Sequence, residues 1–164
     1  MIVLKNILVA TDFSEAADAA LGYGRAFARM FGSTLHVLHV TDDVYLRMGG
    51  DAYISALDTV QNDMAAAAHA RLRTLLIDND PAPLAVKEAV AISAAPAAAI
   101  VEYATANAVD LIIVGTHGRG AVAHLLMGSV AERVVRTASC PVLAVRHPER
   151  DFVTPDALVA AARG

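Results

Sequence analysis

The chain has 164 residues, a single cysteine and a formal net charge of −4, and 56% of its residues are hydrophobic. This length suits one domain with a substantial core, the charge provides no basic surface for a nucleic acid, and one cysteine excludes an internal disulfide framework. No apolar run reaches the roughly 18 to 20 residues that a membrane-spanning helix needs, and the first residues lack the pattern of a signal peptide. We therefore expect a soluble, cytoplasmic protein with no nucleic-acid or membrane partner.

The N-terminal part of the chain predicts a strand, a helix and a second strand. The first strand covers residues 3–10, and Ser14 is a typical N-cap for a helix over residues 15–31. Gly32 follows this helix as a C-cap residue would. The second strand is expected over residues 33–40.

Two glycines interrupt the first predicted helix. Gly22 and Gly24 would each cost the helix about 1 kcal/mol relative to alanine. We therefore expect that both are present because the helix packs closely on the sheet.

The middle of the chain predicts a loop, a long helix and an edge strand. Residues 41–51 are polar and contain a glycine pair, which favours a loop, and residues 52–77 have a helical pattern. A third strand is expected over residues 84–92, where the charges of Lys87 and Glu88 indicate the edge of a sheet.

The C-terminal part continues the alternation of strands and helices. We expect a helix over residues 97–107, a buried strand over residues 110–114, a helix that begins near Ser129 and a fifth strand over residues 141–146. This alternation predicts a single α/β domain with a doubly wound, five-stranded parallel sheet and helices on both faces. Ligands of such folds bind beyond the carboxyl ends of the strands, where the strand order reverses.

A glycine-rich turn follows the fourth predicted strand. Gly115 and Gly118 are separated by two residues, and Gly128 and Ser129 follow after nine more, where a helix pattern resumes. Unpaired N–H groups at a helix N-terminus attract anions such as phosphate. The turn lacks the lysine of a Walker A loop, so backbone amides, Arg119 and a divalent metal would neutralise the phosphate charge.

Several other residues have simpler interpretations. His36 and His39 are three residues apart on a strand, so they face opposite sides of the sheet and do not share a metal ion. Arg71 has the pattern of an ordinary solvated position, and Cys140 that of a structural cysteine. Asp12 is either a ligand-binding group or a carboxylate that stabilises a helix N-terminus, and both roles can coexist.

Three segments of the chain resemble the universal stress protein family: residues 7–14, 115–120 and 128–145. The resemblance covers about residues 1–146, which leaves residues 147–164 as a C-terminal tail. The nucleotide signature of the family is intact in the glycine-rich turn. The resemblance therefore implies a nucleotide-binding domain of the family's ATP-binding branch.

The resemblance also implies which residues hold the nucleotide. Asp12 would bind the ribose or adenine side, the backbone of Val40 would face adenine, and Ala10 and Thr11 would line the floor. The phosphates, with Mg or Mn, would lie against the glycine-rich turn and the following helix. The residues implied there are Gly115, Thr116, Gly118, Arg119, Gly128, Ser129 and Val130.

Similar proteins form homodimers by pairing their fifth strands, which here implies pairing through Val142–Val145. The leading hypothesis is a homodimeric, ATP-binding regulatory module of the stress response, because the phosphate cradle lacks an obvious catalytic base. One alternative is a slow ATPase or self-phosphorylating enzyme that uses Asp12, His117 and a metal. The other is a protein that binds a different adenine nucleotide, such as cyclic AMP.

Overall fold

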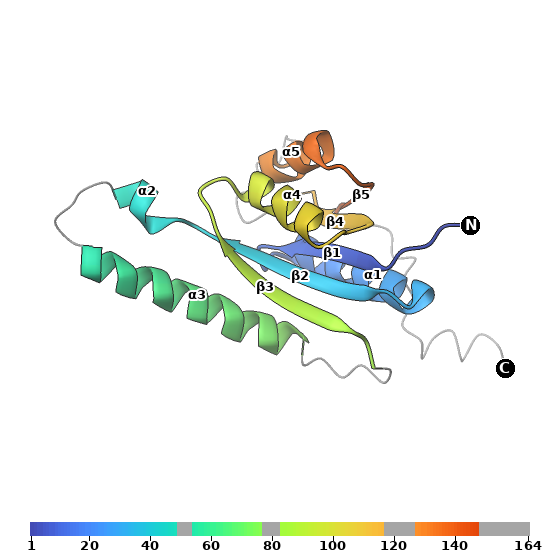
Figure 1. The fold of residues 1–164 in the computed structure, drawn as a ribbon, viewed down its shortest axis with the longest axis horizontal. Helices are drawn as coiled ribbons and strands as arrows, with labels where there is room; N and C mark the ends of the chain where they lie inside the picture. The colour runs from blue at the N-terminus through green and yellow to red at the C-terminus, as the bar shows by residue number, and fades with distance from the viewer. Residues whose placement is uncertain (49–53, 77–82, 117–126, 148–164) are drawn as a thin grey trace.

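The computed structural model describes residues 1–48, 54–76, 83–116 and 127–147. The described residues form one parallel sheet with the strand order β3-β2-β1-β4-β5 (Figure 1). The strands are β1 (Asn6–Thr11), β2 (Thr34–Thr41), β3 (Val86–Ile92), β4 (Leu111–Gly115) and β5 (Val142–Val145). The helices are α1 (Glu15–Phe31), α2 (Val44–Met48), α3 (Ile54–Leu76), α4 (Pro96–Ala106) and α5 (Ser129–Thr137). The predicted α/β fold with a five-stranded parallel sheet is confirmed.

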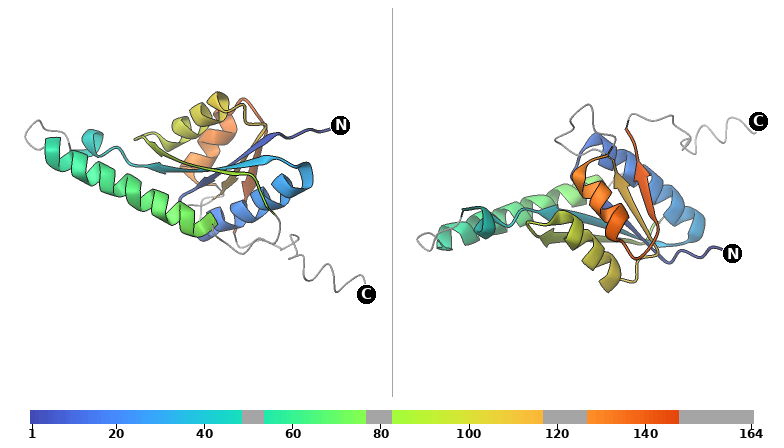
Figure 2. Two further views of the ribbon diagram at one scale, coloured as in Figure 1. Left: turned by 60° about the horizontal axis from the view of Figure 1, so that its bottom comes forward. Right: turned by 90° about the horizontal axis from the view of Figure 1, so that it is seen from above.

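Each face of the sheet is covered by its own helices (Figure 2). Along β1, Ile7 and Val9 pack with residues of α1 and α3 on one face, whereas Leu8 packs with residues of α4 and α5 on the other. All three side chains are fully buried, as expected for a parallel strand covered on both sides. The sheet is therefore doubly wound, as the sequence predicts.

Helix α1 begins and ends where its capping residues predict. The Ser14 hydroxyl accepts a hydrogen bond from the backbone N–H of Ala17 at 3.3 Å. At the other end, Gly32 adopts a left-handed conformation with φ of 65°, and its N–H donates to the carbonyl of Ala28. Because glycine has no Cβ, this backbone conformation costs it little.

The two glycines inside α1 have different surroundings. A Cβ placed on Gly24 would overlap the Val9 side chain and come within 3.2 Å of Leu35 Cδ1, so the helix does approach the sheet closely there. Gly22 faces open space, with no atom within 4 Å of such a Cβ. The expectation of close packing is confirmed for Gly24 and wrong for Gly22, because Gly22 lies on the exposed side of the helix.

The segment predicted as a loop after β2 contains the short helix α2, which corrects the sequence interpretation. Its first residue, Val44, is 7% exposed. The buried side chain of Gln61 on α3 accepts a hydrogen bond from the Val44 N–H at 3.0 Å and donates one to the Asp42 carbonyl at 3.1 Å. A partner 17 residues away in sequence thus stabilises the turn into α2, and no local pattern could predict it.

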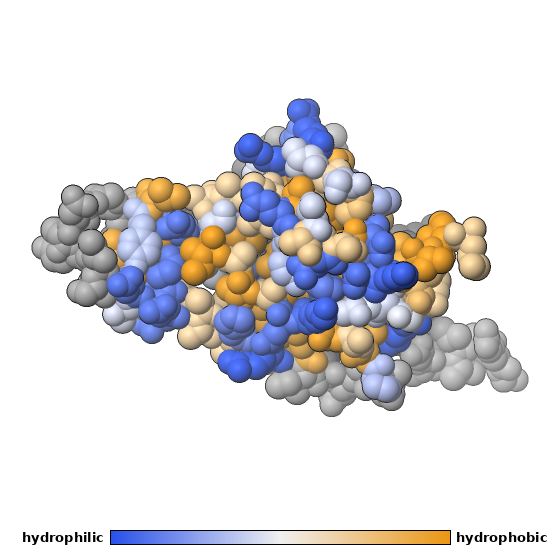
Figure 3. Space-filling view, viewed as in Figure 1, coloured by the Kyte–Doolittle hydropathy of each residue, from blue (hydrophilic) through white to orange (hydrophobic). Residues whose placement is uncertain are grey.

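The two edges of the sheet are formed by β3 and β5. The charged strand β3 lies at one edge, as Lys87 and Glu88 indicate, and β5 lies at the other. Helix α2 and the first turns of α3 extend past the carboxyl end of β2 (Figure 1). The face shown in Figure 3 is a mixture of hydrophilic and hydrophobic residues. No helix among the described residues is long and apolar enough to span a bilayer.

His36 is a buried histidine on the face of β2 that α4 covers, opposite to the face that carries His39. Its side chain is 1% exposed, with Nδ1 at 3.0 Å from the Tyr103 hydroxyl and Nε2 at 3.4 Å from the Asn6 side-chain oxygen. Burial, together with the nearby charge of Lys87, lowers the pKa of His36 from its ordinary value of 6.5. The folded protein therefore holds this imidazole in its neutral form.

We predict that Gly22→Ala raises the free energy of unfolding by up to about 1 kcal/mol, because alanine favours an exposed helix position. Gly24→Ala should lower it, because overpacking costs about 1–3 kcal/mol and outweighs the same helix propensity gain. Urea denaturation of both variants and the wild type tests this contrast. Equal effects of the two substitutions would contradict the packing assigned to α1.

The lowered pKa of His36 predicts a loss of stability in weak acid. The unfolded histidine binds a proton as the pH falls through about 6.5, whereas the buried one does so only at lower pH, so stability is complete above pH 6.5 and decreases below it. The difference in unfolding free energy between wild type and His36→Gln, measured from pH 7.5 to 5, should shift against the wild type as the pH falls. A difference that stays constant over this range would contradict burial of a neutral His36.

Candidate functional site

The strand order reverses between β1 and β4, which pair with Ala10 opposite Val114. From β1 the chain enters α1 on one face of the sheet, and from β4 it continues to α5 on the other face. The carboxyl ends of the two strands therefore flank one crevice. Asp12 follows β1 and Thr116 follows β4, so two of the residues predicted to bind the nucleotide border this crevice.

The two halves of the glycine-rich signature are joined by backbone hydrogen bonds. The N–H of Thr116 donates to the carbonyl of Val145 at 2.7 Å, and the N–H of Gly128 donates to the carbonyl of Thr116 at 2.6 Å. The start of α5 is thus held at the carboxyl end of β4. Gly118 and Arg119, and with them His117, lie outside the described residues.

Helix α5 begins at this junction with its N-terminal amides close to the crevice. Gly128 is the N-cap in an extended conformation, and no side chain caps the helix within the described part of the chain. Ser129 is the first helical residue, and Val130 follows it with 36% of its surface exposed. An uncapped helix N-terminus with an adjacent hydroxyl group is suited to an anion.

Gly115 has a packing role that the sequence did not reveal. A Cβ at this position would lie 2.8 Å from both the carbonyl carbon and the carbonyl oxygen of Ala16. The end of β4 therefore passes against the first turn of α1 at a distance that only glycine permits. This requirement holds whether or not the Gly115 backbone also contacts a ligand.

Asp12 contacts Ser14, the N-cap residue of α1. One of its carboxylate oxygens, Oδ1, accepts hydrogen bonds from the Ser14 N–H at 3.1 Å and the Ser14 hydroxyl at 2.6 Å. The preceding Thr11 is buried, and its Oγ1 accepts the N–H of Phe13 at 3.0 Å. Phe13 has a positive φ of 62°. These bonds fix a tight turn between β1 and α1.

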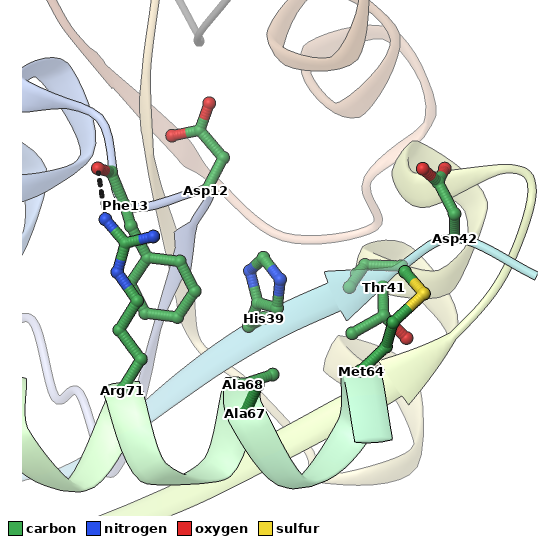
Figure 4. A pocket seen from close by; sticks show the side chains of 10 residues that line it. Asp12, Phe13, His39, Thr41, Asp42, Met64, Ala67, Ala68 and Arg71 are labelled. Carbon is green, nitrogen blue, oxygen red and sulfur yellow. Dashed lines mark hydrogen bonds between the residues drawn. The ribbon is translucent and has the colours of Figure 1, made fainter. Parts of the chain in front are cut away.

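A pocket of about 380 Å³ lies between this turn, the end of β2 and one side of α3 (Figure 4). Its lining unites Asp12 with Val40, as the resemblance implies, whereas Ala10 lies in the core beside α4. Gly115, Gly128 and Ser129 are not part of this lining. The lining residues are Asp12, Phe13, His39, Val40, Thr41, Asp42, Met64, Ala67, Ala68 and Arg71.

Arg71 and Phe13 are pocket residues that sequence reasoning missed. The Arg71 guanidinium carbon lies 4.3 Å from the centroid of the Phe13 ring, and Nη2 donates to the Phe13 carbonyl at 3.5 Å. The Phe13 ring also contacts the His39 ring, with 4.5 Å between the ring centroids. His39 Nδ1 in turn donates a hydrogen bond to the Thr11 carbonyl at 2.7 Å. Arg71 is exposed, as expected, but it is not an ordinary solvated residue.

The sequence did contain a partial signal for this side of the pocket. Met64, Ala67, Ala68 and Arg71 recur at helical spacing and therefore share one face of α3. The partner of that face, the turn at Phe13, is 58 residues away from Arg71. Spacing alone predicts the shared face but not what it covers.

The described residues offer no metal site of their own. They contain no group of three or more His, Cys, Asp or Glu side chains placed to hold an ion. Burial raises the pKa of the half-buried Cys140 thiol, so the thiol is protonated near neutral pH and is a poor nucleophile.

Comparison with known proteins gives one consistent result. The sequence model of the universal stress protein family matches residues 4–146. A universal stress protein of Thermus aquaticus is 33% identical over 144 residues, which are 88% of this chain and 100% of that protein. Universal stress protein MJ0577 of Methanocaldococcus jannaschii is 29% identical over 158 residues, covering 89% of this chain and 97% of the relative.

Solved structures agree with the sequence relatives. The structure of MJ0577 matches this fold with a TM-score of 0.80 at 28% identity, covering 91% of this chain and 100% of that chain. A universal stress protein solved in complex with cAMP matches with a TM-score of 0.58 at 23% identity, covering 88% of this chain and 98% of that one. At that identity the second match indicates the shared fold.

We predict that Gly115→Ala lowers the free energy of unfolding by about 1–3 kcal/mol, because the new Cβ meets backbone atoms that cannot rotate away. Chemical denaturation measures the loss, and Gly22→Ala is the matched control because the same methyl group there enters open space. Wild-type stability in Gly115→Ala would show that β4 does not approach α1 this closely.

Proposed function

Because this chain belongs to the universal stress protein family, we propose that it is an ATP-binding regulatory module. The base and ribose of ATP would occupy the pocket beside Val40 and Asp12, while Ala10 and Thr11, which the resemblance also implies, lie outside its lining. The phosphates would extend to the glycine-rich turn and the start of α5.

One observation carries this proposal: the hydrogen bond from Gly128 to Thr116 holds the uncapped start of α5 beside β4. Strand β4 is the neighbour of β1, whose following turn carries Asp12 into the pocket. A pocket with both apolar and polar walls and an uncapped helix start thus lie at the carboxyl ends of the same sheet. A nucleotide has the matching chemistry, with a flat base at one end and phosphates at the other.

The phosphate contacts that we propose come from the turn and from the first residues of α5. In the described part these are the Ser129 hydroxyl and the N–H groups of Ser129 and Val130, beside a turn shaped by Gly115, Thr116 and Gly128, in which the N–H groups of Thr116 and Gly128 already donate within the protein. Gly118, from the sequence signature, and Arg119, which follows it, complete the proposed set. A divalent cation, Mg or Mn, would take most of its ligands from phosphate and water, as Mg²⁺ commonly does, because the described residues provide no cluster for it.

We assign the nucleotide site to the domain of residues 1–146, separate from the tail of residues 147–164. We further propose a homodimer that forms through β5. This four-residue strand is at the edge of the sheet, and Val142, Leu143 and Ala144 are only partly buried. The unpaired side of such a strand can accept a second strand, and a two-fold pairing would extend the sheet across two copies.

A regulatory role suits the described residues better than catalysis. Oδ1 of Asp12, a carboxylate that borders the crevice, already accepts two hydrogen bonds from Ser14, so this oxygen is held within the turn and is not placed to accept a proton from an attacking water. The nucleotide would then act by being bound rather than by being consumed. Release of phosphate at a steady rate by the purified protein would instead favour the slow ATPase.

The first test is to purify the protein gently without added nucleotide, denature it, and identify any released small molecule by mass spectrometry. Stripped protein is then titrated with ATP by calorimetry. We expect one ATP per chain, and competition by cyclic AMP would identify the alternative nucleotide. A stripped wild-type protein that binds neither nucleotide would refute the proposed function.

We predict that Gly118→Ala weakens ATP binding by about tenfold or more, because a side chain there keeps the backbone from the phosphates. Asp12→Ala should weaken binding without unfolding the domain. Gly22→Ala, which makes the same chemical change on the exposed side of α1, should bind as the wild type does. Unchanged affinity in both site variants would place the nucleotide elsewhere.

A further inference from the structure

We propose that Arg71 reads the base of the bound nucleotide: its guanidinium donates a hydrogen bond to a ring nitrogen of a purine held against α3. This inference rests on the proposed function and extends it to a side chain that the family signature does not include. It makes α3, and not only the strand ends and the glycine-rich turn, a determinant of ligand choice.

The guanidinium of Arg71 is held in place but retains most of its donors. Its carbon lies over the Phe13 ring at 4.3 Å, and one nitrogen donates to the Phe13 carbonyl at 3.5 Å, near the outer limit of a hydrogen bond. A guanidinium has five N–H donors, and within the described chain Arg71 has no carboxylate partner. The contact with Phe13 thus orients a planar donor group at the pocket wall.

The charge of the pocket favours a neutral group over a phosphate beside Arg71. Asp12 and Asp42 contribute two carboxylates to the lining, and Arg71 is the sole Lys or Arg among the described lining residues. A phosphate in the pocket would therefore meet more negative than positive charge. The uncapped start of α5 is a better place for it, which leaves Arg71 to the base.

The rest of the lining has the properties of a base-binding site. One wall of the pocket is formed on α3 by the thioether side chain of Met64 and the small side chains of Ala67 and Ala68. The rings of Phe13 and His39 lie across from this wall (Figure 4). Flat apolar walls with a few oriented polar groups are typical of sites for small molecules, and about 380 Å³ is within their usual range. Purine rings present nitrogen acceptors at their edges, which an arginine fork can reach.

The test compares adenosine with ATP, since adenosine has the base and no phosphate. Calorimetric or NMR titration of Arg71→Met should show both ligands weakened by the same factor, about tenfold, as expected for a lost hydrogen bond to a charged group. Ser129→Ala should weaken ATP and leave adenosine unchanged. Arg71→Lys keeps the charge without the planar fork, so its affinity should remain reduced.

Arg73→Met is the matched control, because Arg73 is an exposed arginine on the same helix outside the pocket lining. It should bind both ligands as the wild type does, and thermal unfolding should show both methionine variants folded. A direct contact is separated from support of Phe13 by the three monodeaza adenosines, which lack N1, N3 or N7. One of them should bind weakly to the wild type and lose nothing further in Arg71→Met.

The possible failures are distinguishable. Wild-type protein that binds no adenine nucleotide overturns the proposed function. If the wild-type protein binds ATP, the proposed function stands and three results would overturn only the role of Arg71. These are no binding of adenosine, a loss of affinity for ATP alone in Arg71→Met, or an equal loss of affinity for all three deaza analogues in that variant.

Discussion

Burial of the sheet on both faces is the constraint on which the rest of this structure depends. The central residues of β1, Ile7 to Val9, have no exposed surface, so helices must cover both sides of the strand. The chain meets this need by winding to one side from β1 and to the other from β4. The crevice at the ends of these strands follows from the winding itself, before any ligand is considered.

The glycines illustrate how packing and binding requirements share one sequence. Gly24 lets α1 approach Val9, and Gly115 lets the end of β4 pass the backbone of Ala16. Gly115 belongs to the nucleotide signature, yet the described structure already requires a glycine there. A glycine in such a signature can therefore be required by the packing of a strand against a helix beside the site, as well as by contacts with a ligand.

The sequence predicted the elements that follow from local periodicity. Strand and helix types, both caps of α1 and the edge position of β3 came from patterns within a few residues. Helix α2 and the role of Arg71 did not, because each depends on a partner far along the chain, Gln61 for Val44 and Phe13 for Arg71. Gly22 was misjudged for a related reason, since a glycine inside a helix does not indicate which side of the helix it occupies.

The buried side chain of Gln61 has a consequence for the shape of the pocket. It joins α3 to the backbone on both sides of Asp43, through the carbonyl of Asp42 and the N–H of Val44. Met64 is about one turn further along the same helix and lies on the same side of the pocket as Asp42 (Figure 4). Moving this part of α3 away from the end of β2 would require breaking both hydrogen bonds of a buried side chain. The separation of α3 from the end of β2 at this side of the pocket is therefore set by a side chain that does not line the pocket.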